Sequence, residues 1–181
     1  MLKFAWLVNV PGSSPEKYSG VYENAESCNM VVGTGDMESA KAFVKKLADE
    51  GYTLFNLCGD FDDDITAEMA ALAGDGVKIS HADYLPEELA KVSALEEFSE
   101  YGIVIVMRGV EQPVEVDVDA DGMHTRAVFV KDLEQAKTAA KKLSDAGVHG
   151  IELCSWFDRE KTEAVIEAIG GATPVGTCGE L

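Results

Sequence analysis

The sequence predicts an α/β protein made of two pseudo-symmetric repeats, each a small, mostly parallel sheet with helices. Three observations lead to this prediction. Apolar runs of strand length alternate with amphipathic segments of helical periodicity, which is typical of β-α-β units. The second half of the chain repeats the first. The 181 residues are 46% hydrophobic and 27% charged, as in ordinary globular proteins, so a disordered chain is not expected.

The repeat is clearest along one helix and one strand of each half. The segment AKAFVKKLADEG (40–51) aligns with AKTAAKKLSDAG (136–147). In the same register, FNLCGDF (55–61) aligns with IELCSWF (151–157). Because both pairs keep their spacing, we interpret the chain as a tandem duplication.

Each repeat is expected to contain the same elements. The apolar runs are strands by their length and flanking residues, and they lie at 4–10, 29–32, 54–58 and 77–80 and, in the second repeat, at 103–107, 125–130, 150–154 and 174–177. Amphipathic helices are expected at 36–51 and 65–73, and at 132–147 and 161–169. In the first of these, Ala40, Val44 and Leu47 recur at helical spacing. Asp36 suits the N-cap, and Gly51 suits the position after the C-terminus.

The segment LPEELAKVSALEEFSE joins the two halves. Pro86 suits the first turn of a helix, and four apolar residues would share one face of it: Leu89, Val92, Leu95 and Phe98. The predicted organisation is a first α/β repeat at 1–84, a linker helix at 85–100 and a second α/β repeat at 101–181. A single-copy ancestor would form a two-fold dimer, so we expect a pseudo-dimeric monomer or a homodimer.

The charge of the chain restricts its partners. Its 15 Lys and Arg against 33 Asp and Glu give a net charge of −18. Such a surface repels phosphate groups, so neither nucleic acid nor an anionic membrane is an expected partner. The N-terminal apolar run is strand-sized, and the cysteines form no C-x-x-C pair and are too few for a disulfide scaffold. We therefore expect a cytoplasmic protein with reduced thiols.

Cys58 and Cys154 are the candidate catalytic residues, because each follows a predicted parallel strand and precedes a helix. Ligands and catalytic groups gather at this end of the strands in open α/β sheets, and a helix N-terminus lowers the pKa of a thiol. Two equivalent cysteines would suit a two-base proton transfer, as in cofactor-independent amino-acid racemases. The competing interpretation is that both are small buried hydrophobic residues at strand ends.

The loops after these cysteines differ between the repeats. The first has GDFDDD, whose carboxylates, Asp60 among them, would cap a helix or attract a cation or amine. The second has SWFDRE, where Trp156 beside Arg159 would stack on a planar ligand or fill the interface between the halves. The two loops therefore suggest that the repeats have diverged.

No metal site and no cofactor is predicted. The segment DVDADG (117–122) imitates the start of a calcium loop, but Val128 stands where that loop needs a bidentate glutamate. Its flanks alternate as strands, so we interpret it as a hairpin turn. The three histidines lack metal-ligand spacing. The usual nucleotide-binding and esterase motifs are absent.

Short patterns carry a family resemblance. They are a Pro-Gly and Pro-Glu-Lys opening, a Leu-Cys-Gly-x-Phe strand end, and Glu-Leu-Cys and Pro-Val-Gly in the second half. The matching residues are Pro11, Gly12, Pro15, Glu16, Lys17, Leu57, Cys58, Gly59 and Phe61, then Glu152, Leu153, Cys154, Phe157, Pro174, Val175 and Gly176. In these residues the chain resembles two tandem copies of a small bacterial domain family with no assigned activity. The resemblance implies a site that combines the Pro-Gly loop with the Cys-Gly loop, with Tyr18 in place of a family histidine.

The favoured functional prediction is a small-molecule-binding or structural accessory protein. The alternative is a cofactor-independent isomerase, racemase or lyase that uses Cys58, with Cys154 or an aspartate of residues 60–64 as its partner. The candidate ligand-binding residues are Pro11, Gly12, Lys17, Tyr18, Gly59, Asp60, Phe61, Ser155, Trp156 and Phe157.

Overall fold

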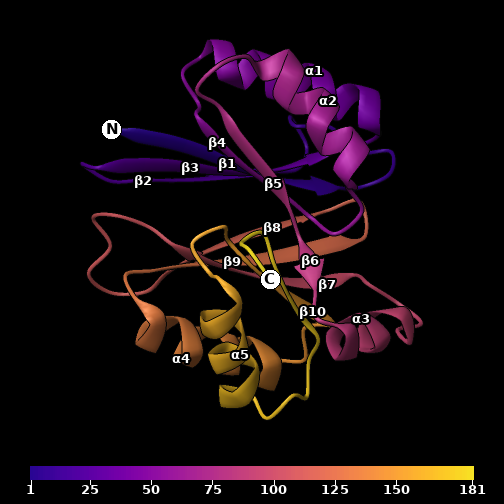
Figure 1. Cartoon of the computed structure of the whole chain (residues 1–181), viewed down its shortest axis with the longest axis vertical. Coiled ribbons are helices and arrows are strands. Elements are labelled where there is room, and N and C mark those ends of the chain that lie inside the picture. Colours follow the sequence, from indigo (N-terminus) through magenta and orange to yellow (C-terminus); the bar gives the residue numbers. More distant parts are fainter.

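Two β-sheets lie face to face, and helices cover the outer face of each (Figure 1). The computed structural model describes residues 1–181. Both sheets are mostly parallel. The predicted α/β class and the two repeated sheet-and-helix units are therefore confirmed.

The first repeat forms a five-stranded sheet of order β2-β3-β1-β4-β5, in which only β2 is antiparallel to its neighbour. Its elements are β1 (Leu2–Asn9), β2 (Ser19–Glu23), β3 (Ser27–Thr34), α1 (Met37–Asp49), β4 (Leu54–Leu57), α2 (Asp63–Ala73) and β5 (Lys78–His81). The edge strand β2 is not among the predicted strands, because it is short and only half-buried and so carries no apolar run.

The second repeat forms a six-stranded sheet of order β6-β11-β10-β7-β9-β8. Its elements, preceded by two from the junction, are β6 (Asp83–Tyr84), α3 (Pro86–Ser93), β7 (Glu100–Val106), β8 (Val114–Ala120), β9 (Met123–Val130), α4 (Leu133–Asp145), β10 (Gly150–Leu153), α5 (Arg159–Ala168) and β11 (Val175–Thr177). Apart from the added β6, this order repeats that of the first sheet. The predicted hairpin turn joins β8 to β9, where Asp121 and Gly122 both have positive φ.

Four of the five helices begin at a capping aspartate, whereas α3 follows Leu85, which provides no side-chain cap. The Asp36 side chain accepts a hydrogen bond from the Ser39 N–H at 2.7 Å at the start of α1, and Asp132 accepts one from the Gln135 N–H at 2.9 Å at the start of α4. After α1, Gly51 has φ +90°, a conformation that favours glycine. The predicted starts and stops of α1 and α4 are confirmed, because these local signals are strong. Helices α2 and α5 each begin two residues before the predicted starts at Ile65 and Lys161.

The junction between the repeats differs from the expected single helix at 85–100. Only Pro86–Ser93 is helical, with Pro86 in the first turn. The chain must then turn into β7, and Phe98 packs over that sheet from a non-helical segment. Its ring lies 5.5 Å from that of Tyr101 and occupies the space in which a Cβ on Gly150 would lie. Before the helix, β6 already pairs with β11 of the second sheet.

The facing sides of the two sheets form the centre of the core. Tyr22 of β2 and Phe129 of β9 meet there with ring centres 5.0 Å apart. Tyr18 is fully buried, and its hydroxyl donates to the Thr125 hydroxyl of the second sheet. Trp6 of β1 is 1% exposed. None of the helices is long and apolar enough to cross a membrane.

Candidate functional site

Two reciprocal hydrogen bonds join the centres of the repeats. Asn56 and Glu152 are the third residues of the equivalent strands β4 and β10. The Gly59 N–H donates to Glu152 Oε1 at 3.0 Å, and the Ser155 N–H donates to Asn56 Oδ1 at 3.2 Å. Each strand-end loop thus contacts the opposite repeat, as a pseudo-two-fold axis requires. Two cavities lie at these contacts, one around Glu152 and one around Asn56.

The cavity around Glu152, here called the acidic cavity, has a volume of about 800 Å³. It is formed by the loop after β4, by β6 and the segment after α3, and by Tyr101 and Glu152 of the second sheet. Its carboxyl groups come from both repeats and from the junction: Asp60, Asp62, Asp63, Asp83, Glu96, Glu97 and Glu152. No lysine or arginine lines it. The cavity therefore concentrates negative charge.

Glu152 is 2% exposed and accepts three hydrogen bonds, from the Gly59 N–H and from the hydroxyls of Tyr84 and Tyr101. Burial raises its pKa from 4.5 to about 7, although the three hydrogen bonds act in the opposite direction. Burial and the nearby Glu152 charge raise the pKa of both tyrosines, so they remain donors at neutral pH. The result is a carboxyl group that exchanges its proton near neutral pH inside a cavity.

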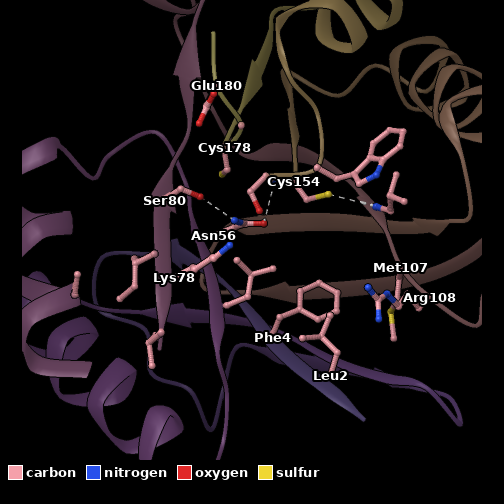
Figure 2. Close-up of a pocket in the computed structure, with 18 of the residues that line it drawn as sticks. Leu2, Phe4, Asn56, Lys78, Ser80, Met107, Arg108, Cys154, Cys178 and Glu180 are labelled. Carbon is pink, nitrogen blue, oxygen red and sulfur yellow. Dashed lines mark hydrogen bonds between the residues drawn. The ribbon is translucent and has the colours of Figure 1, made fainter. Parts of the chain in front are cut away.

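The cavity around Asn56, here called the basic cavity, has a volume of about 1060 Å³. Lys78, Arg108 and Lys131 line it, against a single carboxylate from Glu180. Figure 2 shows Asn56 at its centre, where the Asn56 amide donates to the Ser80 hydroxyl at 3.1 Å. The two cavities therefore occupy equivalent places but carry opposite charge.

The two candidate catalytic cysteines line different cavities, Cys58 the acidic one and Cys154 the basic one. They are 7% and 4% exposed. Each sulfur accepts a backbone N–H at 3.4 Å, Cys58 from Asn9 and Cys154 from Val106. Burial raises the pKa of Cys154 to about 11 and that of Cys58 further still, where the charges of Glu152 and Asp60 add to the effect. Both thiols are therefore protonated at neutral pH.

The predicted ligand-binding residues fall into three groups. Pro11, Gly59, Asp60 and Phe61 line the acidic cavity. Ser155 and Trp156 line the basic cavity, and Trp156 is 42% exposed. The other four residues line neither: Gly12 and Lys17 are exposed in the loop after β1, whereas Tyr18 and Phe157 are fully buried in the core.

Three residues at the centre of the acidic cavity are not among the predicted site residues: Glu152, Tyr84 and Tyr101. Glu152 does leave a signal in the sequence. It is a charged residue inside an otherwise apolar strand, and charged residues are rarely buried without a specific partner. Tyr84 and Tyr101 leave none, because their convergence on one carboxyl group depends on the order of β6, β11, β10 and β7 within the second sheet.

The comparisons with known proteins agree with the architecture. No curated protein matches this chain. A family of unknown function, DUF6506, matches it twice, over residues 2–97 and 99–179. The two matches confirm the predicted tandem duplication. The chain therefore belongs to the DUF6506 family and carries two tandem copies of its domain.

Proposed function

We propose that this protein binds a small organic cation, an amine with an apolar body, in the acidic cavity. The observation that carries the proposal is the set of seven carboxyl groups around one cavity without a lysine or arginine among its lining residues. None of the seven forms an ion pair with a lysine or arginine elsewhere in the chain. The basic neighbour that they have in the lining is His81, whose Nε2 lies 3.5 Å from Asp83 and 3.9 Å from Asp63. Such a field attracts a cation and repels an anion.

One wall of the acidic cavity is apolar and would contact the apolar part of the ligand. Apolar side chains of α3 and of the segment that follows it line the same cavity: Leu89, Val92, Leu95 and Phe98. Leu89 is 52% exposed, which leaves its side chain available to a ligand. A mostly apolar wall with a few polar groups is the usual composition of small-molecule sites.

Glu152 makes the proposed binding dependent on pH. Because its pKa is about 7, the carboxylate form dominates above neutral pH and the neutral form below it. An aliphatic ammonium group remains charged across this range, since its pKa resembles that of lysine at about 10.4. The cation should therefore bind more tightly at pH 8 than at pH 6.

Thiol-based isomerase, racemase or lyase chemistry has less support. A nucleophilic or basic cysteine needs a lowered pKa, whereas burial raises the pKa of both Cys58 and Cys154. A two-base mechanism also needs both thiols at one substrate, and these thiols line different cavities.

The test is calorimetric titration of the native protein with 1-naphthylmethylamine. We expect the amine to bind, and to bind about tenfold more weakly at pH 6 than at pH 8 as Glu152 takes up its proton. The double variant Asp60→Asn/Glu97→Gln should weaken binding by about tenfold through the loss of two cavity charges.

The matched control is Glu26→Gln/Glu111→Gln, which removes two exposed carboxylates that line neither cavity. It should leave the affinity for the amine unchanged. Equal losses in the two double variants would show only a general effect of net charge. That result, or no binding of the amine at millimolar concentration, would refute the proposal.

A further inference from the structure

The basic cavity is exceptional in a chain with a net charge of −18. Most lysines and arginines of this protein form ion pairs with carboxylates on the surface. Lys78, Arg108 and Lys131 form none, although carboxylates outnumber basic residues by more than two to one. All three line this one cavity. Their charges are therefore free to meet an anion from solution.

The charge difference between the cavities has its origin at equivalent positions of the two repeats. At the third residue of the central strand, the acidic cavity has Glu152 and the basic cavity has Asn56. Two residues after the cysteine, the acidic cavity has Asp60 and the basic cavity has Trp156. Both differences remove a negative charge from the basic cavity.

A third difference adds positive charge. The backbone N–H groups that donate to the two cysteine sulfurs belong to Asn9 and Val106, which makes these residues equivalent. Two residues further along, the acidic cavity has Pro11 and the basic cavity has Arg108. All three differences thus change the electrostatic potential in the same direction.

The walls of the basic cavity favour a ligand with a flat apolar part. Phe4 and Met107 are buried side chains in its lining, and in Figure 2 both lie on the same side of the cavity as Arg108. Trp156 is 42% exposed, and its ring packs edge-on against that of Phe157 with centres 5.0 Å apart. An exposed aromatic ring held in this way offers a stacking surface.

From these observations we propose that the basic cavity is a second ligand site, which takes an organic anion with an aromatic body, such as an aromatic carboxylate. Arg108 and Lys78 attract its carboxylate, and Trp156 and Phe4 contact its ring. The site stands independently of the proposed amine site, because a different cavity and different residues form it.

The test is titration of the native protein with 1-naphthoate, followed by calorimetry and by tryptophan fluorescence. Binding should change the fluorescence, since Trp156 lines the cavity while Trp6 is 1% exposed. The double variant Lys78→Gln/Arg108→Gln should raise the dissociation constant at least tenfold. The control Lys3→Gln/Lys17→Gln removes two other lysines without an ion pair and should leave the dissociation constant unchanged.

A competition experiment separates this proposal from the previous one. 1-Naphthoate and 1-naphthylmethylamine should bind together, and Lys78→Gln/Arg108→Gln should leave the affinity for the amine unchanged. Displacement of one probe by the other would show a shared site and overturn the proposal. Failure of naphthoate to bind at millimolar concentration would also overturn it. So would an equal loss of affinity for naphthoate in Lys78→Gln/Arg108→Gln and in the control Lys3→Gln/Lys17→Gln. Failure of the amine alone would leave it standing.

Discussion

Glu152 links the folding of this protein to pH. Its pKa is raised on folding from 4.5 to about 7, so between these values the folded chain binds more protons than the unfolded chain. The free energy of unfolding therefore falls as the pH rises through this window. The contribution of a neutral Glu152 is complete below pH 4.5 and is lost above pH 7. Since one pKa unit corresponds to about 1.4 kcal/mol, the loss is on the order of 3 kcal/mol.

Replacement by glutamine tests this linkage. Glu152→Gln keeps the shape of the neutral side chain, and its carbonyl oxygen can still accept from Gly59 and Tyr84 while its amide donates to the Tyr101 oxygen. We expect the variant to match the parent protein at pH 5 and to exceed its stability by about 1–3 kcal/mol at pH 8. Urea unfolding at both pH values measures the difference.

The control for this variant is Glu111→Gln, an exposed glutamate whose replacement should change the free energy of unfolding equally little at both pH values. If Glu152→Gln is equally destabilising at pH 5 and pH 8, the raised pKa is not the source of the pH dependence.

At the scale of single elements, the position of each cysteine at the end of β4 or β10 determines the pKa of its thiol. Each cysteine follows its strand directly, and a backbone N–H of β1 or β7 donates to its sulfur. This position buries the thiol beside the sheet, where loss of solvation raises its pKa more than the nearby hydrogen bonds lower it.

Alkylation of the native protein with iodoacetamide should therefore be slow at all four cysteines, which are all buried. We expect little modification of Cys58 or Cys154 at pH 8 in the folded protein, and complete modification of both after unfolding in urea. Peptide mass spectrometry resolves the individual sites. Rapid labelling of either residue below pH 8 would favour the thiol-based chemistry instead.

Element boundaries were predictable wherever a local signal determines them. Asp36 and Asp132 cap helices from their own side chains, so the starts of α1 and α4 follow from the sequence. The stretch after Ser93 has the apolar spacing of a helix, but Phe98 uses that spacing to pack over Gly150 in a non-helical segment. Tertiary packing overrides helical periodicity there, and nothing within the segment itself reveals it.

At the scale of the whole molecule, the facing sheet surfaces make the two repeats depend on each other. Trp6, Tyr101 and Phe129 are almost fully buried, and Tyr22 of the first sheet contacts Phe129 of the second. The junction itself is fixed to the second repeat, where the Glu88 carboxylate of α3 accepts a hydrogen bond from the Val175 N–H at 2.9 Å. A separated repeat would expose an apolar sheet face to water.

Splitting the chain after residue 98 tests this dependence. The fragments 1–98 and 99–181 should aggregate or self-associate when expressed alone, because each exposes one face of its sheet. Expressed together, they should copurify as one complex with the circular dichroism spectrum of the intact chain. A soluble, folded monomer of fragment 99–181 would show that the facing surfaces contribute little.

The duplication was predictable from the sequence, because equivalent residues keep their spacing along the chain. The two cavities were not predictable from the sequence, because each combines a strand-end loop of one repeat with the sheet face of the other. The sequence patterns of two loops were enough to predict four residues that line the acidic cavity: Pro11, Gly59, Asp60 and Phe61. Tyr84 and Tyr101 become neighbours of these loops only after the sheets have stacked, and no local pattern encodes that arrangement.

The covalent fusion of the two repeats has a consequence for how such sites evolve. In a homodimer encoded by one gene, every mutation appears on both sides of the symmetry axis, so its two sites remain identical. Here a codon for Arg108 could arise while that for Pro11 stayed as it was, and the same holds for Asn56 and Glu152. Selection can therefore act on each half separately. A single small protein can in this way present two chemically unlike cavities at a fixed separation.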